Sequence, residues 1–463
     1  MIKTDNSESF IKYRKKYPLF MYDSYSYLLE GNQLTFTFDF KIGDKIIFNP
    51  KASITVPQIP QSREINRPLL ENIIFNIGLI ELVSYWKATC SPTIIINAGK
   101  ITSEQEEWWK DLYFNGLGEF LYLNSIHISK GELMNIRSSG KAFDKSSGNY
   151  FKDAYIVPVG GGKDSAVTLE LLKEAGYKVI PLIINPRGAT IDTVLKAGFD
   201  PNDIITIKRT IDPTLLKLND GGYLNGHTPF SAMLAFYTLA AAVMTGVGNI
   251  ALSNESSANE PTIPGTGINH QYSKSFEFES KFRDYYSHYI DSSFNYFSFL
   301  RPLNELQIVT IFSKLTQYHS VFRSCNAGSK TNSWCGHCPK CLFTHIMLSA
   351  FNGEKYADSV IGSKMLNDST MTATFDELSG ISEIKPFECV GTLNDVQTAM
   401  SMIIQSSEEA ELPLLARRFK EKMLVSAEDI STFEDELDRI YQLHDKDHFL
   451  TADLFKILKE ALR

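Results

Sequence analysis

The chain has 463 residues, of which 43% are hydrophobic and 22% are charged. This balance is typical of a globular protein and argues against extended disorder, and the length favours two or three domains. The formal net charge of −8 argues against a general nucleic-acid binder, which would carry a basic face. We therefore expect no nucleic-acid partner.

Compartment and membrane contact follow from the apolar segments and the cysteines. Residues Met1 to Tyr25 contain no apolar run of the length that a signal peptide needs. The apolar segment Pro229 to Val247 contains hydroxyl side chains, is rich in alanine and has no basic flank, so we predict a buried helix rather than a membrane span. Six cysteines without a secretion signal predict a reducing compartment. We expect a cytoplasmic protein with no membrane partner.

The first third of the chain predicts an α+β domain over residues 1–145. Apolar and polar residues alternate over Leu34–Ile42, and this strand forms a predicted hairpin with Lys45–Phe48. A long apolar helix is expected over Pro68–Tyr85, followed by a short strand over Thr93–Asn97. Antiparallel strands covered by helices are typical of this class.

The pattern changes after a serine- and glycine-rich linker at residues 138–149. A short apolar strand at Ala154–Val159, a helix at Ser165–Ala175 and a second strand at Tyr177–Ile184 form a predicted βαβ unit. Such units build an α/β fold with a doubly wound parallel sheet. We assign this second domain to residues 151–350.

The remaining residues, 351–463, predict a helical C-terminal region. Apolar side chains recur there at the spacing of one helix face. The two series are Phe433, Leu437, Ile440 and Tyr441, and then Leu454, Leu458, Ala461 and Leu462.

A glycine-rich turn joins the first strand and helix of the βαβ unit: Gly160, Gly161, Gly162, Lys163, Asp164 and Ser165. Successive glycines expose backbone amides, and the helix start that follows adds a positive dipole end, so the turn suits phosphate. A Walker A loop would need glycine in place of Val157 and a hydroxyl residue in place of Asp164, and a dinucleotide fingerprint would need glycine in place of Ser165. A tight βα turn without a ligand is the alternative interpretation.

The turn resembles the S-G-G-x-D-S signature of the PP-loop ATP pyrophosphatases. Gly160 replaces the first serine of that signature and removes one hydroxyl donor. The resemblance implies a sheet of the adenine nucleotide alpha hydrolase kind and a loop that holds the pyrophosphate of ATP. It also implies that Asp164 works with Mg²⁺ and that the products are an adenylated substrate and pyrophosphate.

Four cysteines follow in the order Cys325-x9-Cys335-x2-Cys338-x2-Cys341. Two short steps after a longer one can surround a tetrahedral Zn²⁺, and four thiolates leave no open position, so we predict a structural zinc. Four unligated cysteines are the alternative. The PP-loop together with this spacing resembles the zinc-bearing 7-deazaguanine synthases.

Further motifs resemble one family over most of the chain, the bacterial UDP-N-acetylmuramoyl-L-alanyl-L-glutamate epimerases. Family members invert the terminal L-Glu of a UDP-linked muramoyl dipeptide, a peptidoglycan precursor, and convert ATP to AMP and pyrophosphate. The resemblance implies this dipeptide as the small-molecule partner. The motifs lie at residues 117–120, 225–227, 253–258, 263–267, 269–271, 324–326, 334–336 and 385–391.

The epimerase reading needs groups that exchange a proton at carbon. Cys389 is the first candidate, because a thiol can act as a carbon base; a small buried residue is the alternative. Glu255 is a candidate for holding Mg²⁺ or the glutamyl amide. The other candidates are His227, His270 and Lys274 for proton transfer, and Arg187 and Lys163 for the phosphates or the γ-carboxylate.

Three other functions remain open at this point. Adenylation of a tRNA base would predict a basic accessory domain, which neither residues 1–150 nor residues 351–463 provide. Synthesis of 7-deazaguanine fits the cysteines but not the long flanking regions. A non-catalytic scaffold has Gly160 as its support. The oligomeric state does not follow from the sequence.

Overall fold

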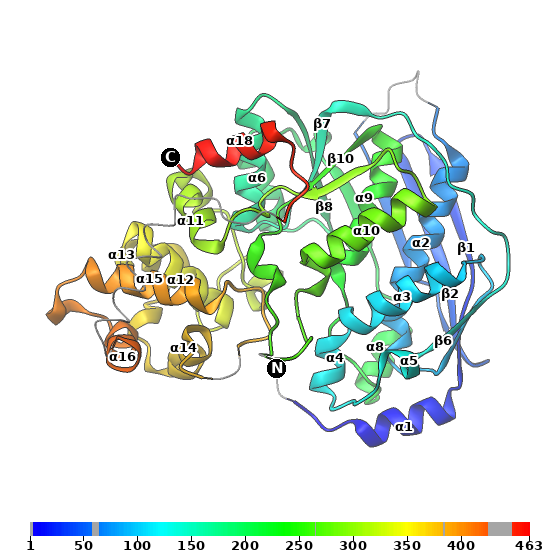
Figure 1. Ribbon diagram of the computed structural model, residues 1–463, viewed down its shortest axis with the longest axis horizontal. Coiled ribbons are helices and arrows are strands. Elements are labelled where there is room, and N and C mark those ends of the chain that lie inside the picture. Colours follow the sequence, from blue (N-terminus) through cyan, green and yellow to red (C-terminus); the bar gives the residue numbers. More distant parts are fainter. Residues whose placement is uncertain (1–2, 58–63, 264, 383–384, 425–446) are drawn as a thin grey trace.

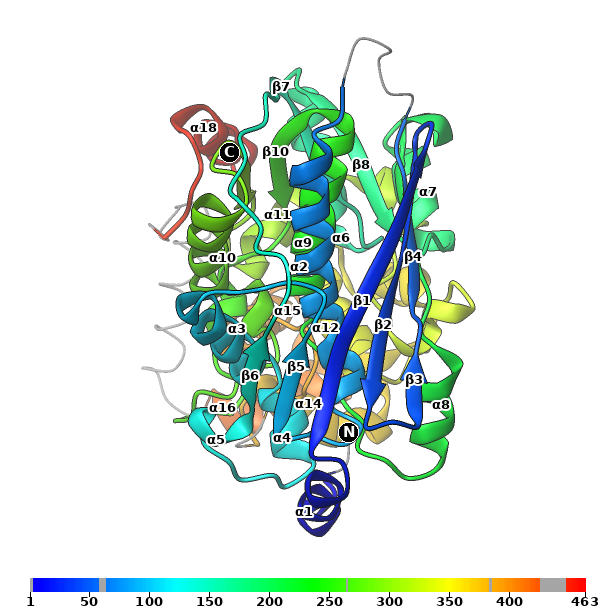
Figure 2. The same cartoon turned by 90° about the vertical axis from the view of Figure 1, so that its right-hand side faces the viewer.

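The computed structural model describes residues 3–57, 64–263, 265–382, 385–424 and 447–463. Within them, eleven strands form one mixed sheet in the order β11-β10-β7-β8-β9-β4-β2-β1-β5-β6, with β3 paired to β2 (Figures 1 and 2). The strands are β1 (Leu19–Glu30), β2 (Gln33–Ile42), β3 (Ile46–Phe48), β4 (Lys51–Thr55), β5 (Thr93–Ile96), β6 (Asn135–Ser138), β7 (Phe151–Pro158), β8 (Lys178–Ile184), β9 (Ile205–Arg209), β10 (Val247–Leu252) and β11 (Asn295–Ser298).

Five neighbouring strands, β11, β10, β7, β8 and β9, are parallel. The predicted βαβ unit is confirmed, because β7 and β8 pair in parallel across α6 (Lys163–Glu174). The α/β class is therefore confirmed as well. Strand order reverses between β7 and β10: the chain moves outward from β7 through β8 to β9, and then returns to the other side of β7.

The N-terminal strands continue this same sheet. The predicted hairpin is confirmed by antiparallel pairing of β2 with β3, in which Phe40 lies opposite Phe48. Strand β4 then pairs antiparallel with β9, so Ala52 lies opposite Arg209. The β9 edge of the parallel part is thereby paired with another strand. The strands of the two predicted domains thus belong to one continuous sheet, and the boundary at residue 145 stays a prediction.

Helices cover both faces of the sheet, and the alternation of side chains along β7 shows which helix meets which face. Ala154 and Ile156 pack into one core, and Tyr155 and Val157 pack into the other. The first core contains α2 (Arg67–Trp86), α9 (Phe230–Thr245) and α10 (Phe276–Tyr289), and the second contains α6, α11 (Glu305–Lys314) and α18 (Ala452–Ala461).

Two of these helices are strongly apolar. By length and composition α2 could cross a membrane, but 94% of its apolar stretch is buried against the rest of the protein, as expected of a core helix. The helix predicted over residues 229–247 is confirmed as the buried helix α9. It ends at Gly246, whose φ of 76° is the left-handed conformation that favours glycine at a helix end.

The C-terminal helices form a third core at one end of the molecule, far from β1 and β2 (Figure 1). They are α12 (Pro339–Asn352), α13 (Glu354–Ile361), α14 (Thr372–Ser379), α15 (Leu393–Gln405) and α16 (Leu414–Met423). The apolar repeat predicted from Leu454 is confirmed, since α18 returns to pack on α6. The helix predicted over residues 433–441 lies outside the described residues.

The remaining helices are shorter or peripheral. They are α1 (Ser7–Lys16), α3 (Ser103–Gly116), α4 (Gly118–Leu123), α5 (Lys130–Leu133), α7 (Gly188–Lys196) and α8 (Pro213–Asp220). Among them, α4 carries the buried Glu119 and α7 packs against the glycine-rich turn.

Candidate active site

A cavity of about 560 Å³ opens where β7 and β10 end. The glycine-rich turn follows β7, and Ser253–Glu255 follow β10; both segments line the cavity. Open α/β sheets bind ligands at the carboxyl ends of their strands, where strand order reverses, and this cavity occupies such a place. Lys274 and Cys389 line the same cavity.

The glycine-rich turn is built to expose its backbone. Gly161 has a φ of 80°, and a Cβ placed there would lie 2.8 Å from the carbonyl carbon of Ala189, so a side chain is excluded. A Cβ on Gly160 would meet no heavy atom of the described residues within 4 Å. Helix α6 begins at Lys163, and Gly162 to Ser165 line the cavity. The bare amides and the positive helix end fit an anion such as phosphate.

A buried ion cluster lies beside this turn. The ammonium of Lys163 is 2.7 Å from Oδ1 of Asp164 and 2.6 Å from Oε2 of Glu305. Burial, together with the nearby negative charge of Asp164 and Glu255, raises the pKa of Glu305 to about 8 against the pull of Lys163. Burial also raises the pKa of Glu255. One ammonium therefore faces more carboxylates than it can neutralise, which is an arrangement suited to a further cation.

A second cluster surrounds the thiol of Cys389. Lys274 donates a hydrogen bond from Nζ to Sγ over 3.1 Å, and the imidazole of His270 lies near enough to the same thiol to interact with it electrostatically. On its other side, Nδ1 of His270 contacts Oε2 of Glu119. Nδ1 of His227 lies 3.3 Å from that same oxygen, and the two imidazole centroids are 4.6 Å apart. A thiol, an ammonium, two imidazoles and a carboxylate thus form one connected group.

Within this group, burial and neighbouring charges shift the pKa values of the thiol and the two imidazoles in different directions. Burial opposes ionisation of Cys389, but Lys274 and His270 hold the pKa of the thiol well below its ordinary value. Burial likewise acts to lower the pKa of His270, yet hydrogen bonds with Cys389 and Glu119 raise it to about 9. Burial and the neighbouring His270 lower the pKa of His227 to about 4. The geometry therefore favours a thiolate beside an imidazolium, with a neutral imidazole next to them.

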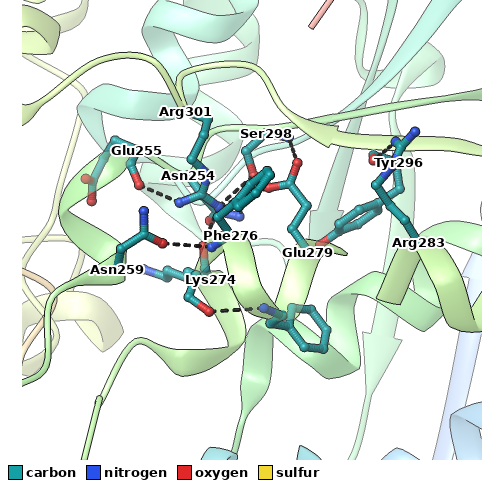
Figure 3. A network of polar contacts seen from close by, with 12 residues as sticks. Asn254, Glu255, Asn259, Lys274, Phe276, Glu279, Arg283, Tyr296, Ser298 and Arg301 are labelled. Carbon is teal, nitrogen blue, oxygen red and sulfur yellow. Dashed lines mark hydrogen bonds and ion pairs between the residues drawn. The ribbon is translucent and has the colours of Figure 1, made fainter. Parts of the chain in front are cut away.

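One buried guanidinium, that of Arg301, contacts one residue of each cluster, Glu255 and Lys274 (Figure 3). Arg301 is 0% exposed, and it donates to the backbone carbonyl of Glu255 over 2.7 Å and to that of Lys274 over 2.5 Å. Its own charge is balanced by Glu279, whose Oε2 lies 3.0 Å away. Arg301 therefore fixes the backbone on the phosphate side and on the thiol side of the cavity with a single side chain.

The structure brings most of the predicted residues into one place. Glu255, Lys274, Cys389 and the turn from Gly160 to Ser165 line the cavity, and so does the exposed Arg187, which donates from Nη1 to Oγ of Ser329 over 3.1 Å. The two histidines reach the site through their contacts with Glu119 and Cys389. They are His227 and His270.

Three residues of the site were missed by sequence reasoning. Glu119 lies in one of the motifs that carry the family resemblance, but nothing local indicates that it meets two histidines. Glu305 sits in the first turn of α11, in a capping box formed by Asn304 and Gln307, so it resembles an ordinary helix start. Arg301 follows β11 without any local signal of its burial.

The four clustered cysteines also come together. Their Sγ atoms are separated by 3.5 Å for Cys338 and Cys341, 3.7 Å for Cys335 and Cys341, and 3.9 Å for Cys325 and Cys338. A tetrahedral Zn²⁺ with Zn–S bonds of about 2.3 Å implies S–S edges of about 3.8 Å. The backbone amide of Gly328 donates to Sγ of Cys325 over 3.1 Å, as expected for a sulfur that carries negative charge. The four side chains fit a zinc ion.

The sequence matches two family models, described as the MurL N-terminal domain over residues 12–299 and the MurL C-terminal domain over residues 320–432. The cavity lies between these two parts, because the glycine-rich turn and Lys274 belong to the first and Cys389 belongs to the second. No solved structure matches the chain.

Similar proteins carry one name, UDP-N-acetyl-alpha-D-muramoyl-L-alanyl-L-glutamate epimerase. The protein of that name from Xanthomonas oryzae pv. oryzae is 32% identical over 76% of this chain and 79% of its own length. The relative from a Micromonospora species is 30% identical over 80% of this chain and 82% of its own length. The relative from Salinispora tropica is 31% identical over 86% of this chain and 87% of its own length. With both family models matched, the chain belongs to the MurL family.

Proposed function

We propose that this protein inverts the terminal L-Glu of UDP-N-acetylmuramoyl-L-Ala-L-Glu to D-Glu, and that ATP first adenylates the glutamyl carboxylate. The names of the relatives support the epimerisation and its substrate, a precursor of peptidoglycan. The observation that carries the proposal is that one cavity holds both a turn suited to phosphate and a reactive thiol cluster.

Elementary chemistry explains why activation would precede inversion. Removing the proton from a carbon next to an ionised carboxylate would create a dianion whose charge has no favourable location. Adenylation turns the carboxylate into a neutral acyl group that withdraws electrons, so that an enolate-like transition state can be stabilised. A protein that performs both steps must hold the α-phosphate of ATP close to the carbon that is inverted.

The phosphate side of the cavity supplies the parts for adenylation. The amides from Gly160 to Ser165 would bind the phosphates, and Lys163 would offset their charge. Carboxylate oxygens are the donors that Mg²⁺ prefers, and Asp164, Glu255 and Glu305 surround this position. When bound there, Mg²⁺ would neutralise charge on the leaving pyrophosphate. Arg187, at the cavity margin, is placed to contact a phosphate or the γ-carboxylate.

The thiol side supplies the parts for inversion. The ammonium of Lys274 would stabilise negative charge on the acyl oxygen as the Cα proton leaves. His270 would exchange the Cα proton beside the thiol of Cys389, and Glu119 holds that imidazole in place. Water must be able to enter at the end, because hydrolysis releases AMP and the free D-Glu carboxylate.

The zinc would have a structural role. Four thiolates leave no coordination position open, so the ion would fix the segment that contains Cys325. Cys325 lines the cavity, and its neighbour Asn326 donates from Nδ2 to Oε2 of Glu388 over 2.7 Å. A bound zinc would thereby support the segment next to Cys389.

The direct test supplies the dipeptide substrate, ATP and Mg²⁺ and measures pyrophosphate, AMP and the configuration of glutamate. We expect the three products in equal amounts. The Lys163→Met variant should lose pyrophosphate release, whereas Lys173→Met, on the same helix but remote from the cavity, should retain it. Pyrophosphate release with a tRNA or a deazaguanine precursor, and none with the dipeptide, would refute the proposal.

A further inference from the structure

Three side chains form a linear chain of contacts that ends in the cavity. The carboxylate of Glu119 contacts Nδ1 of His270, and the same imidazole interacts electrostatically with the thiol of Cys389, to which Lys274 donates a hydrogen bond over 3.1 Å. Glu119 is 1% exposed, and its second oxygen, Oε1, meets no hydrogen-bond partner among the described residues. Carboxylate, imidazole and thiol in this order are the arrangement of a nucleophile, its base and the group that orients the base.

The position of the thiol matters as much as its partners. Cys389 and the turn from Gly160 to Ser165 line the same cavity, so the thiol shares the space in which the adenylated carboxylate would form. The ammonium of Lys274 is 3.1 Å from Sγ, close enough to stabilise both a thiolate and the oxyanion of an attacked carbonyl. A group with these neighbours is equipped for acyl transfer.

Two roles for such a thiol can be distinguished by physical argument. A carbon base works best when its pKa lies near the ambient pH or above it, because the base must hold the proton that it removes. A thiolate stabilised by an ammonium and an imidazolium holds a proton poorly, yet it remains strongly nucleophilic. The surroundings of Cys389 therefore favour attack on carbon over removal of a proton.

We infer that Cys389 captures the adenylated glutamyl group as a thioester, and that Cα is inverted while the substrate is bound to the enzyme through this bond. The inference rests on the proposed function and deepens it. A thioester is neutral at the acyl group and withdraws electrons. The Cα proton therefore stays more acidic than it is beside an ionised carboxylate, as it is in the adenylate. It also allows AMP to leave before inversion.

The steps balance. The thiolate of Cys389 attacks the acyl carbon, the C–S bond forms, the C–O bond to phosphate breaks, and AMP leaves with the electron pair. His270 then takes the Cα proton and passes it to solvent, and a solvent proton returns to Cα on the opposite face. Finally water attacks the thioester, its proton passes to His270, the C–O bond forms and the thiolate departs. The sum is ATP and water converted to AMP and pyrophosphate.

His270 changes its role during this sequence. At rest the thiolate and Glu119 keep the imidazole protonated. Formation of the thioester removes the negative charge of the thiolate, so the imidazole can release its proton and become the base for Cα and for water. Glu119 remains a positioning residue, since it touches the imidazole and not the substrate.

The experiment uses substrate radiolabelled in glutamate, with the full-length protein, ATP and Mg²⁺. Samples are quenched in acid, and the Cys389 peptide is examined by mass spectrometry. We expect a hydroxylamine-sensitive adduct on Cys389, and we expect it to accumulate in His270→Asn, where deprotonation and hydrolysis are slowed by more than about 100-fold. Glu119→Gln should show the same accumulation more weakly. Cys90→Ser serves as the matched control, because Cys90 is buried away from the cavity.

The outcomes separate this inference from the proposed function. Pyrophosphate release in wild type and in His270→Asn, with no adduct on Cys389 in either, would overturn the thioester and leave the epimerase standing. Continued exchange of solvent deuterium into Cα by Cys389→Ala would also overturn it. No release of pyrophosphate by the wild-type protein with this substrate would instead reject the proposed function itself.

Discussion

Replacing Lys274 with methionine removes a charge beside Cys389 and preserves most of the packing. The ammonium lies 3.1 Å from the thiol sulfur. At that distance, and with an effective permittivity of about 20, the attraction between unit charges is about 5 kcal/mol. One pKa unit corresponds to about 1.4 kcal/mol, so the full attraction is equivalent to about 4 units. His270 and water will replace part of it, and we expect the pKa of Cys389 to rise by at least about 2 units in Lys274→Met.

The assay is the rate of alkylation of Cys389 by iodoacetamide as a function of pH, read from the mass of its peptide. In wild type the rate should reach its plateau at a pH well below the range of an ordinary thiol, because the pKa of Cys389 lies well below its ordinary value. In Lys274→Met the profile should shift to higher pH by at least about 2 units, so that at any pH below both midpoints the rate should be lower by about 100-fold or more.

Lys281→Met is the matched control for this prediction. Lys281 is also an ion-paired lysine, but its partners are Asp111 and Glu277, which do not line the cavity. This variant should keep the wild-type profile. Identical profiles for wild type and Lys274→Met, with both proteins folded, would refute the electrostatic explanation of the thiolate.

Three further predictions follow from the same structure. Gly161→Ala should abolish binding of a non-hydrolysable ATP analogue and lower the free energy of unfolding by about 1–3 kcal/mol, because the φ of Gly161 is 80° and a Cβ there would meet Ala189. Gly160→Ala should fold normally, because a Cβ there meets no heavy atom of the described residues within 4 Å. Calorimetry measures the binding, and thermal unfolding measures the stability. Metal analysis should find one zinc per chain, and Cys338→Ser should lose it together with several degrees of melting temperature. The pKa of His227 is lowered to about 4 in the folded protein, so between pH 6.5 and 4 the unfolded state binds more protons than the folded state. The free energy of unfolding should therefore fall as the pH drops from 6.5 to 4. In denaturant titrations, His227→Gln should remove up to about 3 kcal/mol of that loss.

Several features of the fold and the site could be predicted because each depends on a short stretch of sequence. The turn from Gly160 to Ser165, the hairpin of β2 and β3, and the cysteine spacing each depend on residues close together in the chain. Glycine conformation, strand alternation and metal-ligand spacing act over a few residues, and single-sequence reasoning detects them.

The rest depends on contacts between distant parts of the chain. Glu119 and His270 are 151 residues apart, and their contact exists because α4 and the segment after β10 meet behind the cavity. The pairing of β4 with β9, which makes one sheet of two predicted domains, leaves no pattern in either strand. Arg301 could not be recognised because a lone arginine is usually exposed, and its burial depends on Glu279 and on two backbone carbonyls.

The most direct measurement of the central claim, that activation and inversion share one cavity, is a single reaction in D2O with the dipeptide substrate, ATP and Mg²⁺. Pyrophosphate, D-Glu and deuterium at Cα are then measured together. The account predicts one pyrophosphate released for each D-Glu formed, solvent deuterium at the inverted carbon, and loss of all three signals in Lys163→Met. Inversion that proceeds without ATP, or ATP cleavage without any exchange at Cα, would contradict it.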